Sequence, residues 1–295
     1  MSHTVVGSVS ELWRFPVKSM RGEQLDQADF TARGLLGDRT YALIDADSGK
    51  VVSAKSVKLF PDILNCRAAF VEPPRSGAQP PPVKIVLSDG ATVRSDSADV
   101  DRVLSDHFKR NVRLAQVAPE DYTIDMYHPD LGDLDPAGPK DVVLDQKLGA
   151  AYFADSGQPS PVAAGAFFDL FPASVLTEST IDRLNELRPD SQFDRRRFRM
   201  NVIIKANDAG FVENEWVGRD LKIGDARLRI AVPDSRCVMT TLAQGKLARD
   251  PEILKTLARH NKVQVGDAGK FPCAGVYAVV TETGKVRKGD HVVLT

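Results

Sequence analysis

A cysteine that directly follows an arginine is the residue in this chain whose type and setting most plainly suggest chemistry. Cys237 comes after Arg236, in a stretch where Pro233 interrupts an alternating run that ends at Val232. A neighbouring cation favours the thiolate, which is the form of cysteine that binds a metal ion or attacks an electrophile. The residues alone leave metal binding and nucleophilic catalysis equally open.

The other two cysteines give no such signal. Cys66, Cys237 and Cys273 are widely spaced and form no CxxC pair, so a zinc ribbon, a thioredoxin-type motif and a plant-type iron–sulfur run are not expected. We interpret Cys66 and Cys273 as free thiols that act as small buried hydrophobic residues. The histidines are scattered, and none forms a metal-spaced pair.

The elements that must position these residues are mostly strands. Alternation with period two, broken by turn residues, predicts several strand pairs. The expected pairs are 83–87 with 91–94, 221–223 with 227–232, the C-terminal segments 276–281 and 286–294, and 40–44 with 51–53. Helices are expected over 99–108, after Thr177, and after Asp250 with Pro251 at the first position. The fold class is therefore mainly β with accessory helices (α+β), and we expect it to be barrel-like.

Two stretches look like loops rather than elements. Residues 72–82 contain five prolines, and residues 119–161 are richer in Asp, Gly and Pro than their flanks. We expect the second stretch to be the loop-rich boundary between two domains, 1–118 and 119–295. The chain of 295 residues is long enough for such a pair.

Composition excludes several classes of protein. Hydrophobic residues make up 42% and charged residues 27%, and the formal net charge is −1. Such a charge provides no overall field to attract nucleic acid or an anionic membrane. No apolar run approaches the length that spans a bilayer, and the N-terminus has no pattern of a signal peptide. The sequence therefore predicts a soluble protein, cytoplasmic by default, that binds neither nucleic acid nor membranes.

Several short motifs occur together in one order along the chain. They are Phe15 to Ser19, Gly34 to Arg39, Phe198 to Val202, Arg236-Cys237 with Thr240-Thr241, and the closing Gly-Val-Tyr and Val-Arg-Lys-Gly-Asp segments. Together they resemble the MOSC family, named for the molybdenum cofactor sulfurase C-terminal domain, preceded by the β-rich domain that accompanies it. The order is that of the mitochondrial amidoxime-reducing components and their bacterial relatives. The resemblance implies a β-barrel-like MOSC domain after an N-terminal β-rich domain.

The resemblance also implies a site for the molybdenum cofactor (Mo-molybdopterin). Carried over residue by residue, it makes Cys237 the catalytic residue and the protein ligand to molybdenum, which suits a soft metal that takes anionic sulfur. The residues implied to hold the pterin and its phosphate are Lys18, Ser19, Arg39 and Arg199, with Ser235 and Arg236 beside the metal and Asn201 ordering the adjacent loop. A dianionic phosphate in a partly dry cleft requires such cations and donors.

One segment departs from the family pattern. Leu170 and Phe171 stand before Pro172, where relatives often carry small hydroxyl residues. Their side chains offer no hydroxyl contact, so only their backbone N–H groups could serve the cofactor, and the apolar groups would shape a substrate pocket. The cluster 195–197 is interpreted as a solvated face outside the site, and as a docking patch for an acidic electron donor.

The function implied is two-electron reduction of N-hydroxylated or N-oxygenated small molecules. Electrons would come from a separate flavin or iron–sulfur protein, since the chain has no cluster motif and no GxGxxG fingerprint. One alternative is a carrier that stores or passes on the cofactor without turnover. Another is sulfur transfer through a Cys237 persulfide; pyridoxal phosphate binding is a label of the wider family, but no pyridoxal-binding domain is visible here to generate the sulfur.

Overall fold

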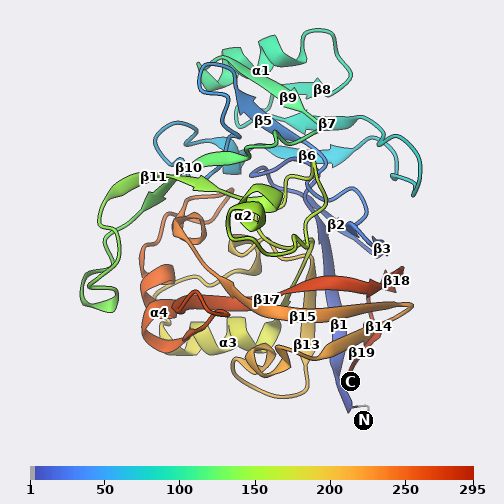
Figure 1. Ribbon diagram of the computed structural model, residues 1–295, viewed down its shortest axis with the longest axis vertical. Coiled ribbons are helices and arrows are strands. Elements are labelled where there is room, and N and C mark those ends of the chain that lie inside the picture. The colour runs from blue at the N-terminus through green and yellow to red at the C-terminus, as the bar shows by residue number, and fades with distance from the viewer. Residues whose placement is uncertain (1–3) are drawn as a thin grey trace.

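The computed structural model describes residues 4–295, which form two lobes stacked along the long axis of the molecule (Figure 1). One lobe, at the bottom of Figure 1, is a closed barrel with α3 (Glu178–Leu187) and α4 (Glu252–His260) on its outside. The other lobe, at the top, contains smaller sheets and α1 (Val100–Phe108). The helix α2 (Gly149–Asp155) lies between them.

Seven strands close the barrel because β12 pairs with both β13 and β17. In order around the ring they are β12 (Ala173–Thr177), β13 (Val202–Ala206), β1 (Thr4–Arg14), β19 (His291–Leu294), β14 (Asp220–Ile223), β15 (Ala226–Ser235) and β17 (Lys270–Glu282). Neighbours are antiparallel except β12 and β13. Alternate residues such as Leu221, Ile223, Leu228 and Ile230 point inward and form one apolar core, as a closed sheet requires.

The remaining strands extend the barrel or build the upper lobe. β2 (Glu23–Leu25) pairs with β1, and β16 (Lys262–Gln264) pairs with β17. The smaller sheets are β18 (Gly284–Arg287) with β3 (Gln27–Thr31) and β4 (Gly34–Leu35); β5 (Ala42–Asp45) with β9 (Val112–Ala115); β6 (Arg67–Phe70) with β7 (Val83–Val86) and β8 (Thr92–Arg94); and β10 (Thr123–His128) with β11 (Val142–Lys147). The upper lobe has its own apolar core.

Most expected elements are confirmed. The fold is mainly β with accessory helices and a barrel, and β7–β8 and β14–β15 are hairpins. All three expected helices are present. The hydroxyl of Thr177 accepts a hydrogen bond from the Thr180 N–H (3.1 Å), and Asp250 accepts one from the Glu252 N–H (2.9 Å). Both side chains therefore satisfy N–H groups that lack a partner in the first turn of a helix.

Two expected strand pairs are different in the structure. β17 already has β15 on one edge and β12 on the other, so β18 pairs with β3 instead, and β19 pairs with β1 and β14. Segments 40–44 and 51–53 share only one bridge, Ile44 with Val51, because β5 forms its ladder with β9. In both cases a distant strand occupies the edge that the local pattern assigned to a neighbour.

The stretch 119–161 is not only loop. It contains β10, β11 and α2. The β11 strand begins Val142-Val143-Leu144, three exposed apolar residues in a row, and this run hides the period-two pattern. Residues 72–82 contain no helix or strand, as expected.

The division into 1–118 and 119–295 stays a prediction, and the strand pairing bears on it at the N-terminus. β1 lies between β13 and β19 in the barrel, and β2 pairs with β1. Ala28, Phe30 and Leu35 also pack in the barrel core, so the N-terminal segment contributes to both lobes. Among residues 4–295, no helix is both long and apolar enough to cross a membrane.

Candidate functional site

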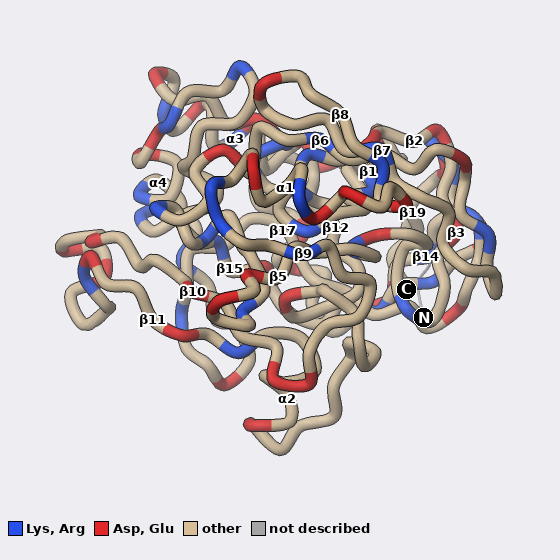
Figure 2. Tube along the Cα trace, turned by 90° about the horizontal axis from the view of Figure 1, so that it is seen from above, with Lys and Arg blue, Asp and Glu red and all other residues tan. Residues whose placement is uncertain are grey.

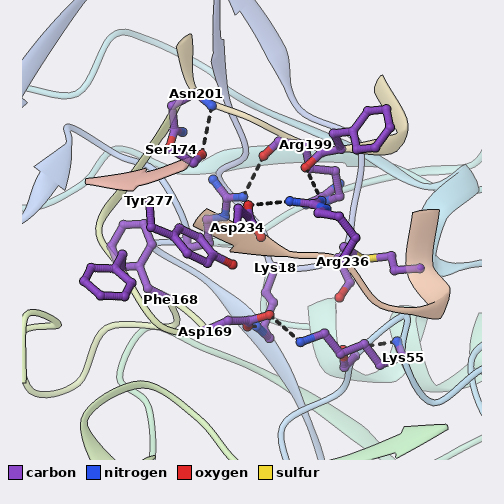
Figure 3. Close-up of a pocket in the computed structure, with 16 residues that line it drawn as sticks. Lys18, Lys55, Phe168, Asp169, Ser174, Arg199, Asn201, Asp234, Arg236 and Tyr277 are labelled. Atoms are coloured by element: carbon purple, nitrogen blue, oxygen red, sulfur yellow. Dashed lines mark hydrogen bonds and ion pairs between the residues drawn. The ribbon is translucent and has the colours of Figure 1, made fainter. Parts of the chain in front are cut away.

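A polar pocket lies where the two lobes meet (Figure 3). Residues from the first sixty positions face residues from beyond position 165 across it. Its lining consists of Lys18, Ser19, Arg39, Ser53, Lys55, Phe168, Asp169, Phe171, Ser174, Phe198, Arg199, Asn201, Asp234, Arg236, Met239 and Tyr277. The pocket therefore exists only because both parts of the chain fold against each other.

Three of these residues have a strained backbone. Ser19, Arg39 and Arg199 have φ of 65°, 47° and 56°, and they are three of the five non-glycine residues with positive φ among residues 4–295. This left-handed conformation costs side-chain-bearing residues of order 1–3 kcal/mol, and it gathers at functional sites. Local bonds hold it, including Arg39 N–H to the Phe15 carbonyl (2.9 Å). This backbone conformation directs the three side chains into the pocket.

The charge of the lining is positive. Five cations line it, namely Lys18, Arg39, Lys55, Arg199 and Arg236. Two carboxylates, Asp169 and Asp234, line it as well, and a third, buried Asp38, contacts Arg39 from behind. Five cations against three carboxylates leave a net charge of +2. Burying an excess of like charge is costly unless an anion completes the site.

Asp169 lies at the centre of the lysine side of the pocket. It contacts Lys18, and its second oxygen accepts a hydrogen bond from Lys55 at 2.7 Å. Burial alone would raise the pKa of Asp169, but the two ammonium groups hold that pKa well below its usual range. Burial lowers the pKa of Lys18 to about 8, although the negative charge of Asp169 raises that pKa. Lys18 is therefore the basic group of the pocket that loses its proton most readily near neutral pH.

Arg236 anchors the opposite side. It contacts Asp234 and donates from Nη2 to the Phe198 carbonyl at 2.7 Å. Burial raises the pKa of Asp234 to about 6, although the Arg236 charge works in the other direction. The Nε of Arg236 is buried and has no hydrogen-bond partner among residues 4–295. An unpartnered buried donor in a pocket is an available contact for a ligand.

Asn201 joins both lobes beneath the pocket. Its amide nitrogen donates to Asp38 at 2.9 Å and to the Trp13 carbonyl at 3.2 Å, and its oxygen accepts from Ser174 at 3.1 Å. Asp38 in turn accepts from the Phe15 N–H at 2.7 Å. Asn201 therefore fixes the positions of the segments that carry Arg39 and Arg199 relative to each other.

Ion pairs occupy much of the pocket. With Lys18 and Lys55 on Asp169, and Arg236 on Asp234, the remaining cavity is about 70 Å³. A space of this size holds only a few waters, so a larger anion would compete with the two carboxylates for these cations.

Six of the eight site residues expected from the sequence line this pocket: Lys18, Ser19, Arg39, Arg199, Asn201 and Arg236. Ser235 does not; it is half-buried at the end of β15, opposite Cys273. Cys237 is half-buried and begins the short 3-10 helix Val238–Thr241. Cys237 is not among the lining residues, but Arg236 before it and Met239 after it both line the pocket.

Sequence reasoning missed several lining residues. Lys55 and Asp169 form the central ion pairs, yet neither lies in a periodic segment or a motif that marks it. Phe171, which was expected from the sequence to shape a substrate pocket, lines this pocket and stacks on Tyr277, with ring centroids 5.3 Å apart. Leu170 is not among the lining residues.

The arginine cluster 195–197 is only partly solvated. Arg197 was expected to be solvated, but it is buried and donates to the carbonyl oxygens of Thr240 (3.2 Å), Leu242 (3.2 Å) and Ala248 (2.7 Å). It supports the segment after Cys237 from inside. Arg195 and Arg196 are exposed, as expected.

The core interpretation of the other two cysteines is confirmed. Cys66 and Cys273 are both buried. Burial raises the pKa of the Cys66 thiol to about 11 and that of the Cys273 thiol to about 12. Thiols with such pKa values are inert near neutral pH.

Comparison with known proteins agrees with this architecture. Residues 6–75 match the family model of the MOSC N-terminal beta barrel domain, and residues 165–293 match that of the MOSC domain. Mitochondrial amidoxime-reducing component 1 of Homo sapiens is 25% identical over 98% of this chain and 83% of its own length. The mouse protein of that name is also 25% identical, over 98% of this chain and 82% of its own length. Mitochondrial amidoxime reducing component 2 of Bos taurus is 25% identical, over 97% of this chain and 83% of its own length.

Both family matches cover the lobes that form the pocket, and they occur in chain order. The barrel holds the second match, and the pocket lies between the two matched regions. The chain is a MOSC domain protein with an N-terminal MOSC β-barrel domain.

Proposed function

We propose that the pocket binds the molybdenum cofactor and that the chain is an oxidoreductase for N-hydroxylated or N-oxygenated small molecules. The observation that carries the proposal is the meeting of five cations from both lobes in one pocket, three of its residues on strained backbone. The relatives at 25% identity are named for the reduction of amidoximes, and the chain matches 83% and 82% of their length.

The donor set suits the cofactor. Lys18, Arg39 and Arg199, with the hydroxyl of Ser19, would hold the dianionic phosphate, because charge-assisted hydrogen bonds are the strongest available to it. The free Nε of Arg236 would serve an oxygen or nitrogen acceptor of the pterin. Cys237, next to the pocket, would provide the anionic sulfur that ligates molybdenum.

When bound, the cofactor supplies two-electron redox chemistry at an N–O bond, for which protein side chains have no equivalent. The chain's own residues do the rest. Phe168 and Phe171 line the pocket and exclude water from one side. Lys18, with its pKa of about 8, still carries its proton at neutral pH and so contributes a positive charge at Nζ to the phosphate. Electrons are taken from a separate flavin or iron–sulfur protein.

The proposal is tested by expressing the protein in a host that makes the cofactor and measuring metal, pterin and turnover. We expect about one molybdenum per chain and oxidation of the dithionite-reduced protein by an amidoxime. Lys18→Ala and Arg199→Ala should each lower occupancy, since each removes a contact worth about 1.5–3 kcal/mol. Arg229→Ala, in an exposed ion pair on the barrel with Asp220, is the matched control.

The outcomes separate enzyme from carrier. Full molybdenum occupancy without reoxidation by any N-hydroxylated compound would favour a protein that stores or delivers the cofactor. Absence of molybdenum and pterin would refute cofactor binding itself. Full occupancy in both Lys18→Ala and Arg199→Ala would place the cofactor elsewhere.

A further inference from the structure

A second cleft shares Arg199 with the first pocket but opens between different segments. Six basic residues line it: Arg21, Arg67, Arg195, Arg196, Arg199 and Lys246. No carboxylate is among its lining residues. Elsewhere the charges are mixed, with Lys and Arg close to Asp and Glu along most of the chain (Figure 2). This concentration of one sign is therefore a local feature of the cleft.

Most of these cations have no acidic partner. Arg195 pairs with Glu11 and Arg196 with Asp194, each at 2.6 Å. Among residues 4–295, Arg21, Arg67, Arg199 and Lys246 form no ion pair. Six cations with two carboxylate partners leave a net charge of +4. Such a concave, positive surface concentrates anions and binds phosphate oxygens well.

The walls of the cleft are held by hydrogen bonds to Asn65 and Cys66. The Arg21 N–H donates to the Cys66 carbonyl (2.9 Å), and the Arg21 guanidinium donates to the Asn65 carbonyl (2.8 Å). The Gly245 N–H donates to the Asn65 side chain at 2.9 Å. Gly245 has φ of 58°, and a Cβ there would lie 3.0 Å from Nη1 of Arg21. The cleft is thus formed before any ligand arrives, which reduces the entropic cost of binding.

Its floor combines aromatic rings with an unused donor. Trp13 and Phe15 are stacked, with centroids 6.4 Å apart and planes inclined by 17°, and the Arg199 guanidinium lies 4.4 Å from the Phe15 centroid. Gln244 lines the cleft and is only 4% exposed, yet its side-chain nitrogen has no partner among residues 4–295. A flat ring could stack beside Trp13 while an acceptor takes the Gln244 N–H.

We propose that this cleft binds a nucleoside 5′-phosphate, with the phosphate on the basic residues and the base near Trp13 and Gln244. The cleft has a volume of about 410 Å³, which is within the usual range of about 300–1,000 Å³ for small-molecule sites. Arg199 and Gln244 line the cleft but are each at least 95% buried, so only a small ligand that enters the cleft could contact them. A docked acidic protein would touch only the exposed rim. Arg199 is shared with the first pocket, but Arg21, Arg67 and Lys246 are not, so the proposal does not depend on cofactor binding there.

Calorimetric titration of the full-length protein with AMP, GMP and inorganic phosphate tests it. We expect saturable one-to-one binding of a nucleoside monophosphate, about tenfold tighter than inorganic phosphate, because stacking of a base is worth about 1–3 kcal/mol. The double variant Arg67→Ala/Lys246→Ala should weaken nucleotide binding about tenfold or more, through loss of charge-assisted contacts. Gln244→Leu should weaken the nucleotide but leave inorganic phosphate unchanged.

Arg229→Ala, which removes an exposed arginine on the barrel, should leave all three titrations unchanged. Circular dichroism of each variant shows that the fold is kept. Absence of saturable binding by either nucleotide at millimolar concentration would overturn the proposal. So would equal affinities for nucleotide and inorganic phosphate, or a double variant that binds like the parent. An acidic protein that binds through Arg67 and Lys246, while neither nucleotide does, would show that the rim serves protein docking instead.

Discussion

Lys18 and Asp169 are the residues whose ionisation most directly controls the pocket. Burial lowers the pKa of Lys18 to about 8, whereas the free amine has its pKa near 10.5. Its partner Asp169 stays ionised because two lysines hold its pKa well below the usual range. As the pH rises from 5, the pocket first loses one positive charge when Asp234 ionises near pH 6, and it loses another above pH 8 when Lys18 gives up its proton.

This gives a pH prediction for anion binding. Affinity for a phosphate-bearing ligand should be highest below pH 8 and fall as Lys18 loses its proton above that pH, because the bound anion interacts with the charged form. Binding measured from pH 7 to pH 9, above the titration of Asp234, should show the fall in the parent protein. In Lys18→Arg the fall should be smaller, because the introduced guanidinium keeps its charge, and the remainder would come from Arg199, whose pKa burial lowers to about 9. A parent profile that is flat through pH 9 would contradict the role of Lys18.

The three cysteines should behave differently on substitution. Cys66→Ser and Cys273→Ser should keep the cofactor and activity, with a stability loss of about 1–2 kcal/mol from burying a hydroxyl. Cys237→Ser should abolish reduction while the fold remains. Thermal unfolding and amidoxime turnover of the three variants check this. If Cys273→Ser were inactive and Cys237→Ser active, Cys237 would not be the ligand to molybdenum.

At the scale of elements, β12 and β17 close the barrel through a narrow contact. Gly275 in β17 has φ of 79°, and a Cβ there would lie 2.6 Å from the Val175 carbonyl oxygen in β12. It would also lie 2.4 Å from the methyl carbon of Met200. No side chain fits at this position without moving a strand.

Gly275→Ala should therefore destabilise the protein more than a matched glycine variant. Gly218 has φ of 80° and open space around its Cβ position. Gly218→Ala should cost only the backbone strain, about 1–2 kcal/mol. Gly275→Ala should cost a further 1–3 kcal/mol or so from overpacking. Denaturant unfolding of both variants measures the difference in the free energy of unfolding. Equal losses in the two variants would show that β12 and β17 can move apart without an energetic penalty.

Elements with strong local signals could be predicted from the sequence, and those set by distant partners could not. The cap at Thr177 and the hairpin turn at Gly224 act on neighbours within a few residues, so their outcome is visible locally. The partner of β18 depends on which edges of β17 remain free after barrel closure. The same holds for the site: Lys18 and Arg199 lie in recognisable motifs, whereas Lys55 reaches the pocket only through a long-range contact with Asp169.

At the scale of the whole molecule, the two lobes share one site, and the proposed reaction would take its electrons from a separate protein. The sequence has no cluster-binding motif and no GxGxxG fingerprint after a strand. NADH or NADPH added to the purified protein with an N-hydroxylated substrate should therefore give negligible turnover. A chemical reductant, or a flavin or ferredoxin reductase from the host, should restore it. Robust turnover with NADH alone would refute the need for a donor protein.

X-ray absorption at the molybdenum edge tests the central claim most directly. The account predicts about one molybdenum per chain, with one protein thiolate in its sulfur shell beyond the two sulfurs of the pterin dithiolene. In Cys237→Ser that additional sulfur should be missing, while Cys273→Ser should give the spectrum of the parent protein. A sulfur shell that is identical in the parent protein and in Cys237→Ser would contradict the assignment of Cys237 as the ligand.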